Sequence, residues 1–256
     1  MLTPKKINFY YFSGTGNTLL VVKEMAKFFE ESGYEVHLKK MEKHKEVELE
    51  ENTVLGLGFT VAFQSTYGFV WDFLKNLPET DKCTKVFMVD TMAEYSGGIV
   101  GPLKKLLLKK GYKPIGEKEI RMPSNLIGKL NHDIIERKIE KGLKEAKKYA
   151  HDIVYESSHW GKMPLPNVLD KISQSTRVLK FFRKFYPMSV NEEKCIKCEL
   201  CVKLCPIDNI VMEEYPKHLD KCEYCMRCFA FCPTNAIKIK RANFKQYKSV
   251  NANDLL

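Results

Sequence analysis

Eight of the nine cysteines in this 256-residue chain fall into two copies of one short pattern, and no other feature constrains the fold as strongly. Each copy reads C-x2-C-x2-C-x3-C-P, and the copies run from Cys195 to Pro206 and from Cys222 to Pro233. Thiolates at this spacing wrap a short loop around a bound inorganic group. A segment of this size has little apolar core, so bonds between thiolates and metal supply much of its folding energy.

The spacing predicts two [4Fe–4S] clusters, because this run binds such clusters in bacterial ferredoxins. The fourth cysteine of each run lies too far along the chain to join its own loop, and it ligates the other cluster. The first predicted ligand set is therefore Cys195, Cys198, Cys201 and Cys232. The second predicted ligand set is Cys222, Cys225, Cys228 and Cys205.

Three other interpretations of the cysteines fit the pattern less well. Disulfides need an oxidising compartment, and the chain begins without the apolar run of a signal peptide. Zinc sites need four ligands, usually as two distant pairs, which leaves the third cysteine of each run unexplained. Isolated structural cysteines would not repeat. The pattern thus favours clusters, with zinc as the main alternative.

The formal net charge of +10 first suggests a nucleic-acid partner. The lysines are instead spread along predicted helices beside glutamates, which is typical of a solvated surface. We therefore expect no nucleic-acid binding, and we expect redox proteins, including acidic ones, as partners. No apolar run has the length of a membrane span, so we expect a cytoplasmic protein without stable membrane insertion, from an anaerobe. The sequence leaves a homo-oligomer open.

The first part of the chain alternates predicted strands and helices. Buried strands are expected at residues 7–12, 34–38, 54–59, 85–89 and 117–122. Helices are expected at residues 17–32, 69–77, 101–110 and 133–155. This alternation predicts an α/β fold with a doubly wound parallel sheet, and 2-1-3-4-5 is the favoured strand order. Ligands bind such sheets at the carboxyl ends of the strands.

Changes in composition divide the chain into four predicted units. Residues 1–157 form the α/β domain, 158–189 a helical connector, 190–240 a small α+β two-cluster domain, and 241–256 a tail. Residues 168–186 have the pattern of a basic amphipathic helix, which suits a membrane surface or, as we favour, packing on the preceding domain. The polar tail is predicted to be partly disordered, and the charged run at 39–51 to be a solvated connection.

A loop rich in glycine and hydroxyl groups directly follows the first predicted strand, with the sequence Ser13-Gly14-Thr15-Gly16-Asn17-Thr18. Backbone N–H groups at the start of a helix form an anion site, and glycines let the backbone curl around a phosphate. The loop lacks the lysine of a Walker motif and the third glycine of the dinucleotide fingerprint. It therefore predicts a site for a terminal monophosphate, with an ordinary glycine-rich turn as the alternative.

This loop resembles the phosphate loop of flavodoxins. Together with the cysteine runs, it makes the chain similar to the iron–sulfur flavoproteins that fuse a flavodoxin-like domain to a two-cluster ferredoxin. The resemblance implies bound FMN, with its ring between the loops that follow the third and fourth strands. The implied FMN-binding residues are Ser13, Gly14, Thr15, Gly16, Asn17, Thr18, Thr60, Phe63, Tyr67, Thr91, Met92, Tyr95, Gly97 and Gly98.

The resemblance implies an electron-transfer protein that relays electrons between two [4Fe–4S] clusters and FMN. Flavins exchange one or two electrons and each cluster exchanges one, so the pair can split or gather electron pairs. A carrier between redox partners is favoured over an enzyme, because no substrate site is visible in the sequence. The alternative is a flavin-dependent reductase of a small molecule such as a quinone, with the clusters as electron inlet. A redox sensor is a third interpretation.

Overall fold

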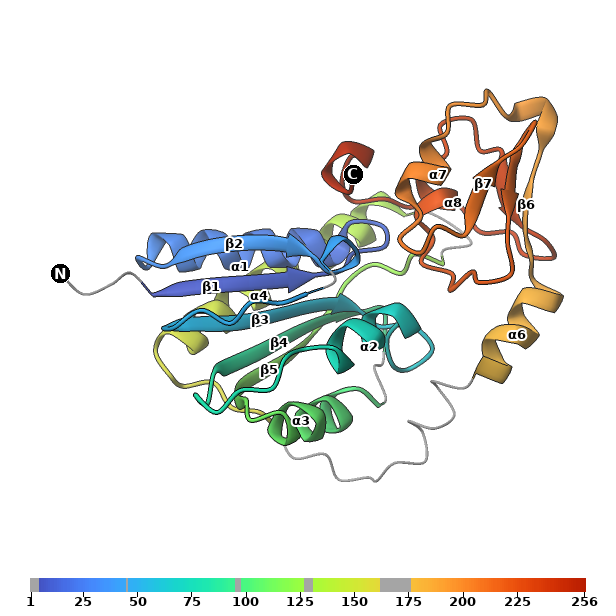
Figure 1. Cartoon of the computed structure of the whole chain (residues 1–256). Coiled ribbons are helices and arrows are strands. Elements are labelled where there is room, and N and C mark those ends of the chain that lie inside the picture. The colour runs from blue at the N-terminus through green and yellow to red at the C-terminus, as the bar shows by residue number, and fades with distance from the viewer. Residues whose placement is uncertain (1–4, 45, 95–97, 127–130, 162–175) are drawn as a thin grey trace.

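The computed structural model describes residues 5–44, 46–94, 98–126, 131–161 and 176–256 (Figure 1). Its larger part is a five-stranded parallel sheet with the order β2-β1-β3-β4-β5, which confirms the predicted fold class and strand order. The strands are β1 (Lys6–Tyr11), β2 (Glu35–Lys40), β3 (Thr53–Thr60), β4 (Lys85–Met92) and β5 (Lys113–Arg121). Their carboxyl ends point toward the C-terminal part of the chain, drawn in orange and red.

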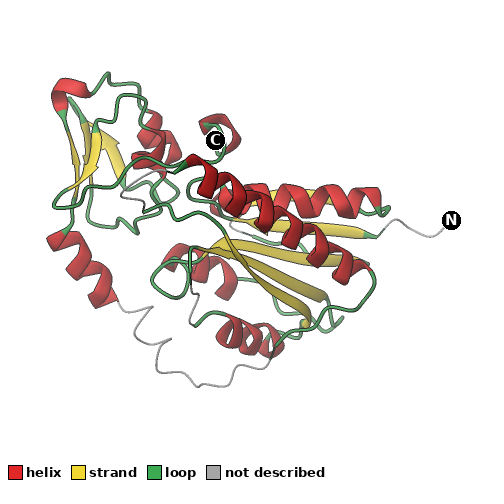
Figure 2. Cartoon of the chain, turned by 180° about the vertical axis from the view of Figure 1, so that it is seen from behind, coloured by secondary structure: helices red, strands yellow, loops and turns green. Residues whose placement is uncertain are grey.

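Helices cover both faces of the sheet (Figure 2). One face carries α1 (Asn17–Glu31) and α4 (His132–Val154), and the other carries α2 (Gly68–Lys75) and α3 (Val100–Lys109). Successive side chains of a strand point to opposite faces, so Phe87 belongs to the first core and Met88 to the second. Apolar side chains fill both cores, so a polar ligand site is expected at the ends of the strands.

The predicted strand bounds agree with the structure for the inner strands and differ most for β5. The sequence predicts a strand at 117–122, whereas β5 begins at Lys113. β5 is an edge strand in which only Gly116 and Ile120 are buried. Its first residues therefore lack the continuous apolar run that marks a strand covered on both faces.

The C-terminal part contains two short antiparallel pairs and two short helices. β6 (Met188–Val190) pairs with β9 (Ile237–Ile239), and β7 (Ile210–Met212) pairs with β8 (Pro216–His218). The helices α7 (Leu200–Leu204) and α8 (Arg227–Phe231) each lie within a cysteine run. The small core of this part includes cysteines among its buried residues, as expected where metal–thiolate bonds support the fold.

Only part of the predicted connector helix at 168–186 falls within the described residues, as α6 (Thr176–Phe185). The Phe182 ring packs on Phe63, with 5.1 Å between ring centroids, and lies 6.4 Å from Tyr224. This contact agrees with a connector that packs on the preceding domain. In the described part of the chain, no helix combines the length and the apolar character needed to cross a bilayer.

The prediction of a partly disordered tail is wrong, because the first residues of the tail pack on the cluster domain and its last residues pack on the sheet domain. Leu255 is 2% exposed and belongs to the core that α1 covers. A short 3-10 helix (Ala252–Asp254) is closed by a capping box that Asn251 forms with Asp254. Asp254 also pairs with Lys23 of α1 at 2.9 Å. We call residues 246–256 the C-terminal segment.

Candidate cluster sites and interdomain cavity

The structure gathers the eight cysteines around two small cavities. Cys195, Cys198 and Cys201 line the first cavity together with Cys232 of the second run. Cys222, Cys225 and Cys228 line the second cavity together with Cys205 of the first run. We call these the first and second thiol cavities. The grouping is the crossed one expected from the pattern, and the role of the cysteines as ligands stays a prediction.

The two cysteine loops have the same backbone conformation. Lys197 and Glu199 flank the middle cysteine of the first loop, with φ of 57° and 58°. Tyr224 and Met226 flank the middle cysteine of the second loop, with φ of 57° and 67°. Left-handed residues other than glycine are uncommon, and these matched pairs curl each loop around its cavity.

The fourth cysteine of each run also has matching surroundings. The backbone N–H of Asn209 donates to Cys205 Sγ at 3.2 Å, and that of Ala236 donates to Cys232 Sγ at 3.2 Å. Hydrogen bonds to a thiolate stabilise its charge and influence the potential of a bound cluster. The backbone at both positions therefore suits a ligating thiolate.

The donor set fits an iron–sulfur cluster better than a single metal ion. All nine cysteines have free thiols. Within the described residues, no three His, Cys, Asp or Glu side chains converge closely enough to hold one metal ion. Four thiols around a cavity instead suit a larger group, and soft thiolates are the usual ligands of iron–sulfur clusters.

Burial and hydrogen bonding act on the thiols in opposite directions. Burial raises the pKa of Cys225 to about 12 and that of Cys201 to about 11. Burial also acts to raise the pKa of Cys232, but hydrogen bonds from the Ile237 and Ala236 backbone outweigh it and lower this pKa. Ligands must be deprotonated, so occupation of the thiol cavities releases protons.

Arg227, in the second cysteine loop, joins the C-terminal part to the sheet domain. Its Nη2 lies 2.6 Å from Glu42 Oε1, and the two side chains are only 3% and 5% exposed. Its Nε donates to the Ser13 carbonyl oxygen at 2.9 Å, and its guanidinium lies 4.6 Å from the centroid of the Phe12 ring. The prediction of a solvated connection is wrong at Glu42, because Arg227 neutralises this carboxylate in a buried pair.

The second cysteine loop makes two further contacts with the sheet domain. The Glu223 carboxylate accepts a hydrogen bond from the Gly68 N–H at the start of α2, where the helix dipole favours a negative charge. A Cβ atom at Gly14 would lie 2.5 Å from the Cys225 carbonyl oxygen, so the two backbones are in direct contact. The first loop is more open, and Ile196, which corresponds to Glu223, is 63% exposed.

The predicted phosphate loop lies beneath this interface. Ser13 and Thr18 are 0% exposed and Thr15 is 3% exposed. The Thr18 hydroxyl shares hydrogen bonds with the hydroxyls of Thr60 and Thr91, at 2.9 and 2.8 Å. These three predicted FMN-binding residues are therefore brought together, and their hydroxyls are bonded to one another.

A cavity of about 760 Å³ lies between the carboxyl ends of β3, β4 and β5, α6 and the second cysteine loop. We call it the interdomain cavity. Its walls are rich in aromatic side chains, which are Phe63, Tyr67, Phe181, Phe182, Tyr186, Tyr224 and Phe244. Tyr224 and Met226 line this cavity and also the second thiol cavity. These two residues therefore form a wall that the two cavities share.

The residues predicted to contact a flavin ring have different positions in the structure. Phe63, Tyr67 and Met92 line the interdomain cavity, whereas Thr60 and Thr91 are bonded to Thr18 beside it. Gly98 is buried and donates its N–H to the Gln64 carbonyl oxygen at 2.9 Å. Tyr95 and Gly97 lie outside the described residues.

Sequence reasoning missed several residues of this region. Phe182 and Tyr186 of the connector carried the signal of an amphipathic helix, without an indication of what they cover. Arg227 was missed, although a charge at the position equivalent to Leu200 of the first run was an available signal. Tyr247 gave no signal, since its contact with Asn17 spans 230 positions of sequence.

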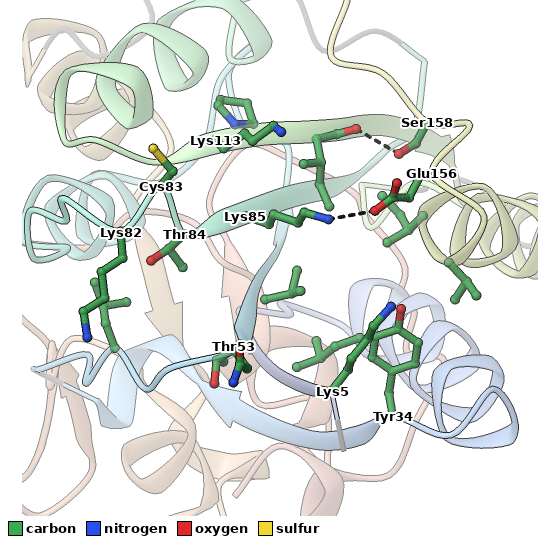
Figure 3. Close-up of a pocket in the computed structure, with 18 of the residues that line it drawn as sticks. Lys5, Tyr34, Thr53, Lys82, Cys83, Thr84, Lys85, Lys113, Glu156 and Ser158 are labelled. Atoms are coloured by element: carbon green, nitrogen blue, oxygen red, sulfur yellow. Dashed lines mark hydrogen bonds and ion pairs between the residues drawn. The ribbon is translucent and has the colours of Figure 1, made fainter. Parts of the chain in front are cut away.

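A second large cavity, of about 830 Å³, opens at the amino ends of the strands (Figure 3). Lysines and carboxylates line it, and Lys85 pairs with Glu156 at 2.7 Å across it. The ninth cysteine, Cys83, is exposed on its wall. None of the predicted site residues that the structure describes lines this cavity, which lies at the opposite end of the sheet from the cysteine runs.

Comparison with known proteins assigns the C-terminal part. Residues 188–211 and 215–238 match the family of the 4Fe-4S binding domain. Comparison with curated proteins finds no match. Since both matched segments contain a cysteine run, residues 188–238 form a ferredoxin-type 4Fe–4S domain.

Solved structures similar to this chain include several flavodoxins. Flavodoxin 1 from Bacillus cereus is 14% identical over 59% of this chain and 97% of its own, with a TM-score of 0.44. The Megasphaera elsdenii flavodoxin is 21% identical over 56% of this chain and 98% of its own, with a TM-score of 0.38. The observed strand order is itself that of a flavodoxin-like sheet. In this chain a 4Fe–4S binding domain therefore follows a domain with the flavodoxin-like sheet order.

Proposed function

We propose that the chain is an electron-transfer protein in which two [4Fe–4S] clusters exchange electrons with a flavin, FMN, in the interdomain cavity. The observation that carries this proposal is the shared wall formed by Tyr224 and Met226. A group in the second thiol cavity and a planar group in the interdomain cavity would be close neighbours. Each cluster supplies one-electron chemistry when bound, and a flavin supplies one- or two-electron chemistry.

The exposure of the cysteines and the contacts of their loops suggest an order for the two cluster sites, from the protein surface to the sheet domain. The first thiol cavity lies on the open side of the domain, where Cys198 is exposed. The second thiol cavity lies nearer the sheet domain, because its loop contacts Gly14 and Gly68 of that domain. We assign the first site to exchange with an external redox protein, including an acidic one steered by the basic chain. Free thiols and clusters suit the reducing cytoplasm.

The interdomain cavity and the phosphate loop differ in how well they suit FMN. The aromatic walls, including Phe63 and Tyr67, suit a flat conjugated ring, and carboxyl strand ends are the usual ligand position in such sheets. The loop is buried, and its Thr18 hydroxyl is already bonded within the protein. In this arrangement the residues fit the ring and do not fit a phosphate in the loop.

Rapid mixing tests the relay directly. Chemically reduced, cluster-loaded protein is mixed anaerobically with FMN, and the loss of oxidised-flavin absorbance is followed. Wild type and Cys83→Ser should reduce the flavin at the same rate, because Cys83 lies far from both thiol cavities. Cys228→Ser, which removes a ligand of the second site, should react much more slowly. Equal rates for Cys228→Ser and wild type would contradict the proposed order.

The second candidate function is a flavin-dependent reductase of a small molecule such as a quinone. The size of the interdomain cavity, about 760 Å³, favours this candidate, because it offers room beyond the ring for a second planar molecule. Steady-state turnover with quinones, disulfides and nitro compounds separates the two functions. Rates above those of free FMN would favour the reductase, and rates equal to free FMN favour the carrier.

A further inference from the structure

The phosphate loop is in contact with the chain's own C-terminal segment. The backbone N–H of Ser249 donates to the Thr15 carbonyl oxygen at 2.9 Å, and Ser249 Oγ lies 3.4 Å from the same oxygen. Tyr247 donates its hydroxyl to Asn17 Oδ1 at 2.7 Å, while Asn17 Nδ2 donates to the Pro123 carbonyl oxygen at 2.8 Å. Both polar ends of Asn17 are therefore engaged within the protein.

The contact between loop and segment is also close in space. A Cβ atom added at Gly16 would lie 2.6 Å from Ser249 Oγ and 2.7 Å from a Val250 methyl carbon. On the other side, the Cys225 carbonyl oxygen occupies the space next to Gly14. A phosphate is much larger than a methyl group, so these faces of the loop have no room for one while the segment is in place.

The C-terminal segment is firmly anchored. Leu255 is 2% exposed in the core beneath α1, and Asp254 pairs with Lys23 at 2.9 Å. Gln246 Nε2 donates to the carbonyl oxygens of Phe229 and Cys232, at 2.6 and 3.0 Å. The segment thus contacts the cluster domain, the phosphate loop and α1, three parts of the chain that are distant in sequence.

The interdomain cavity reaches the loop without including it. Asn125 lines the cavity, and its Nδ2 would lie 3.9 Å from a Cβ atom at Gly14. Met226, which follows Cys225 in the chain, also lines the cavity. A flat ring can therefore occupy the cavity while the loop beside it is closed.

We infer that the phosphate loop of this chain is the receptor for its own C-terminal segment, so that the docked protein binds a flavin by its ring and gains no affinity from its phosphate. This inference rests on the proposed binding of a flavin in the interdomain cavity. It assigns the cavity a specificity: riboflavin and FMN bind equally while the segment is docked. Phosphate selectivity arises only when the segment leaves the loop.

The test compares the binding of riboflavin and FMN by the quenching of flavin fluorescence. Wild type should bind the two with equal dissociation constants. Two variants release the loop: a chain that ends at Lys245, and the full-length Ser249→Pro, which removes the N–H donor to Thr15. Each should favour FMN by about tenfold or more, because phosphate gains charge-assisted hydrogen bonds in the open loop. Lys248→Ala, at an exposed neighbouring residue, is the matched control and should behave as wild type.

Iron content and circular dichroism establish which variants retain the fold. Should the truncated chain lose its iron, the full-length Ser249→Pro variant decides. A wild-type preference for FMN of about tenfold, or variants that stay unselective, overturns the inference and leaves the proposed flavin site intact. Failure of wild type to bind either flavin overturns the proposed function itself, so the two failures are distinguishable.

Discussion

Arg227 joins the two domains through a buried charge. It forms a buried pair with Glu42 and also bonds the Ser13 carbonyl oxygen of the phosphate loop. Loss of one member leaves the other charge buried without compensation, whereas joint replacement by apolar groups costs much less. The pair is therefore a strong test of whether the observed interface forms in solution.

We predict that Arg227→Met lowers the free energy of unfolding by about 3–5 kcal/mol, because Glu42 stays buried and unpaired. The double variant Arg227→Met with Glu42→Met should be more stable than Arg227→Met alone. Denaturant unfolding of the cluster-loaded protein, followed by circular dichroism, measures both. Lys6→Met, in the exposed pair with Glu50, serves as control and should change stability little. Simple additivity of the Arg227 and Glu42 effects would contradict the buried pair.

Asp90, near the carboxyl end of β4, is a buried carboxyl group with a raised pKa. It is 0% exposed, and neither carboxylate oxygen has a hydrogen-bond partner among the described residues. Burial, and then the neighbouring carboxylates of Glu119 and Glu117, raise the pKa of Asp90 well above its usual value. The folded protein thus retains a proton that the unfolded chain loses above a pH of about 4. Stability from this group therefore falls as the pH rises from about 4 toward the folded pKa.

We predict that Asp90→Asn stabilises the protein, and by more at pH 8 than at pH 5. Asparagine has nearly the same shape and needs no proton, so the pH-dependent loss from Asp90 disappears. Burial raises the pKa of Glu119 as well, and the variant keeps that smaller dependence. Thermal unfolding at the two pH values measures the difference. A gain that is equal at both, or larger at pH 5, would count against a protonated Asp90.

At the scale of single elements, two helix ends offer a matched comparison. Gly33 follows α1 with φ of 84°, and Gly111 follows α3 with φ of 85°. No described residue lies within 4 Å of a Cβ atom built at Gly33, whereas at Gly111 such an atom would clash with the Thr80 carbonyl oxygen. The two glycines share a backbone conformation and differ in the space around them.

We predict that Gly33→Ala costs about 1–2 kcal/mol, the strain of a left-handed residue with a side chain. Gly111→Ala should cost clearly more, because alanine also forces the Thr80 loop to move. The melting temperatures of the two variants provide the comparison. Similar values would mean that the contact between the end of α3 and Thr80 is not formed.

The sequence predicted the elements well where local pattern decides them. Buried strands such as 54–59 carry continuous apolar runs, and the cysteine spacing specifies which thiols share a cavity. The contacts that join the domains were not predictable, because they connect positions far apart in sequence. Arg227 and Glu42 are separated by 185 positions, and Tyr247 and Asn17 by 230. Contacts over such separations produce no local sequence pattern. The contact of the C-terminal segment with the phosphate loop could therefore be found only in the structure.

At the scale of the whole molecule, the proposed relay uses three neighbouring cavities. The first thiol cavity faces outward, the second lies against the sheet domain, and the interdomain cavity shares Tyr224 and Met226 with the second. Each thiol cavity in this series is lined by three cysteines of one run and by the fourth cysteine of the other run. This crossed pairing of the cysteines is the central claim, because the positions assigned to the two clusters depend on it.

Iron and sulfide quantified per chain in two double-cysteine variants test this claim most directly. Cys195→Ser with Cys232→Ser removes two ligands of the same site, and we predict that about four irons remain, as one intact cluster. Cys195→Ser with Cys205→Ser changes two cysteines of the same run but damages both sites, and we predict much less iron. Retention of one cluster by the second variant and loss of both by the first would contradict the crossed assignment and the order of sites built on it.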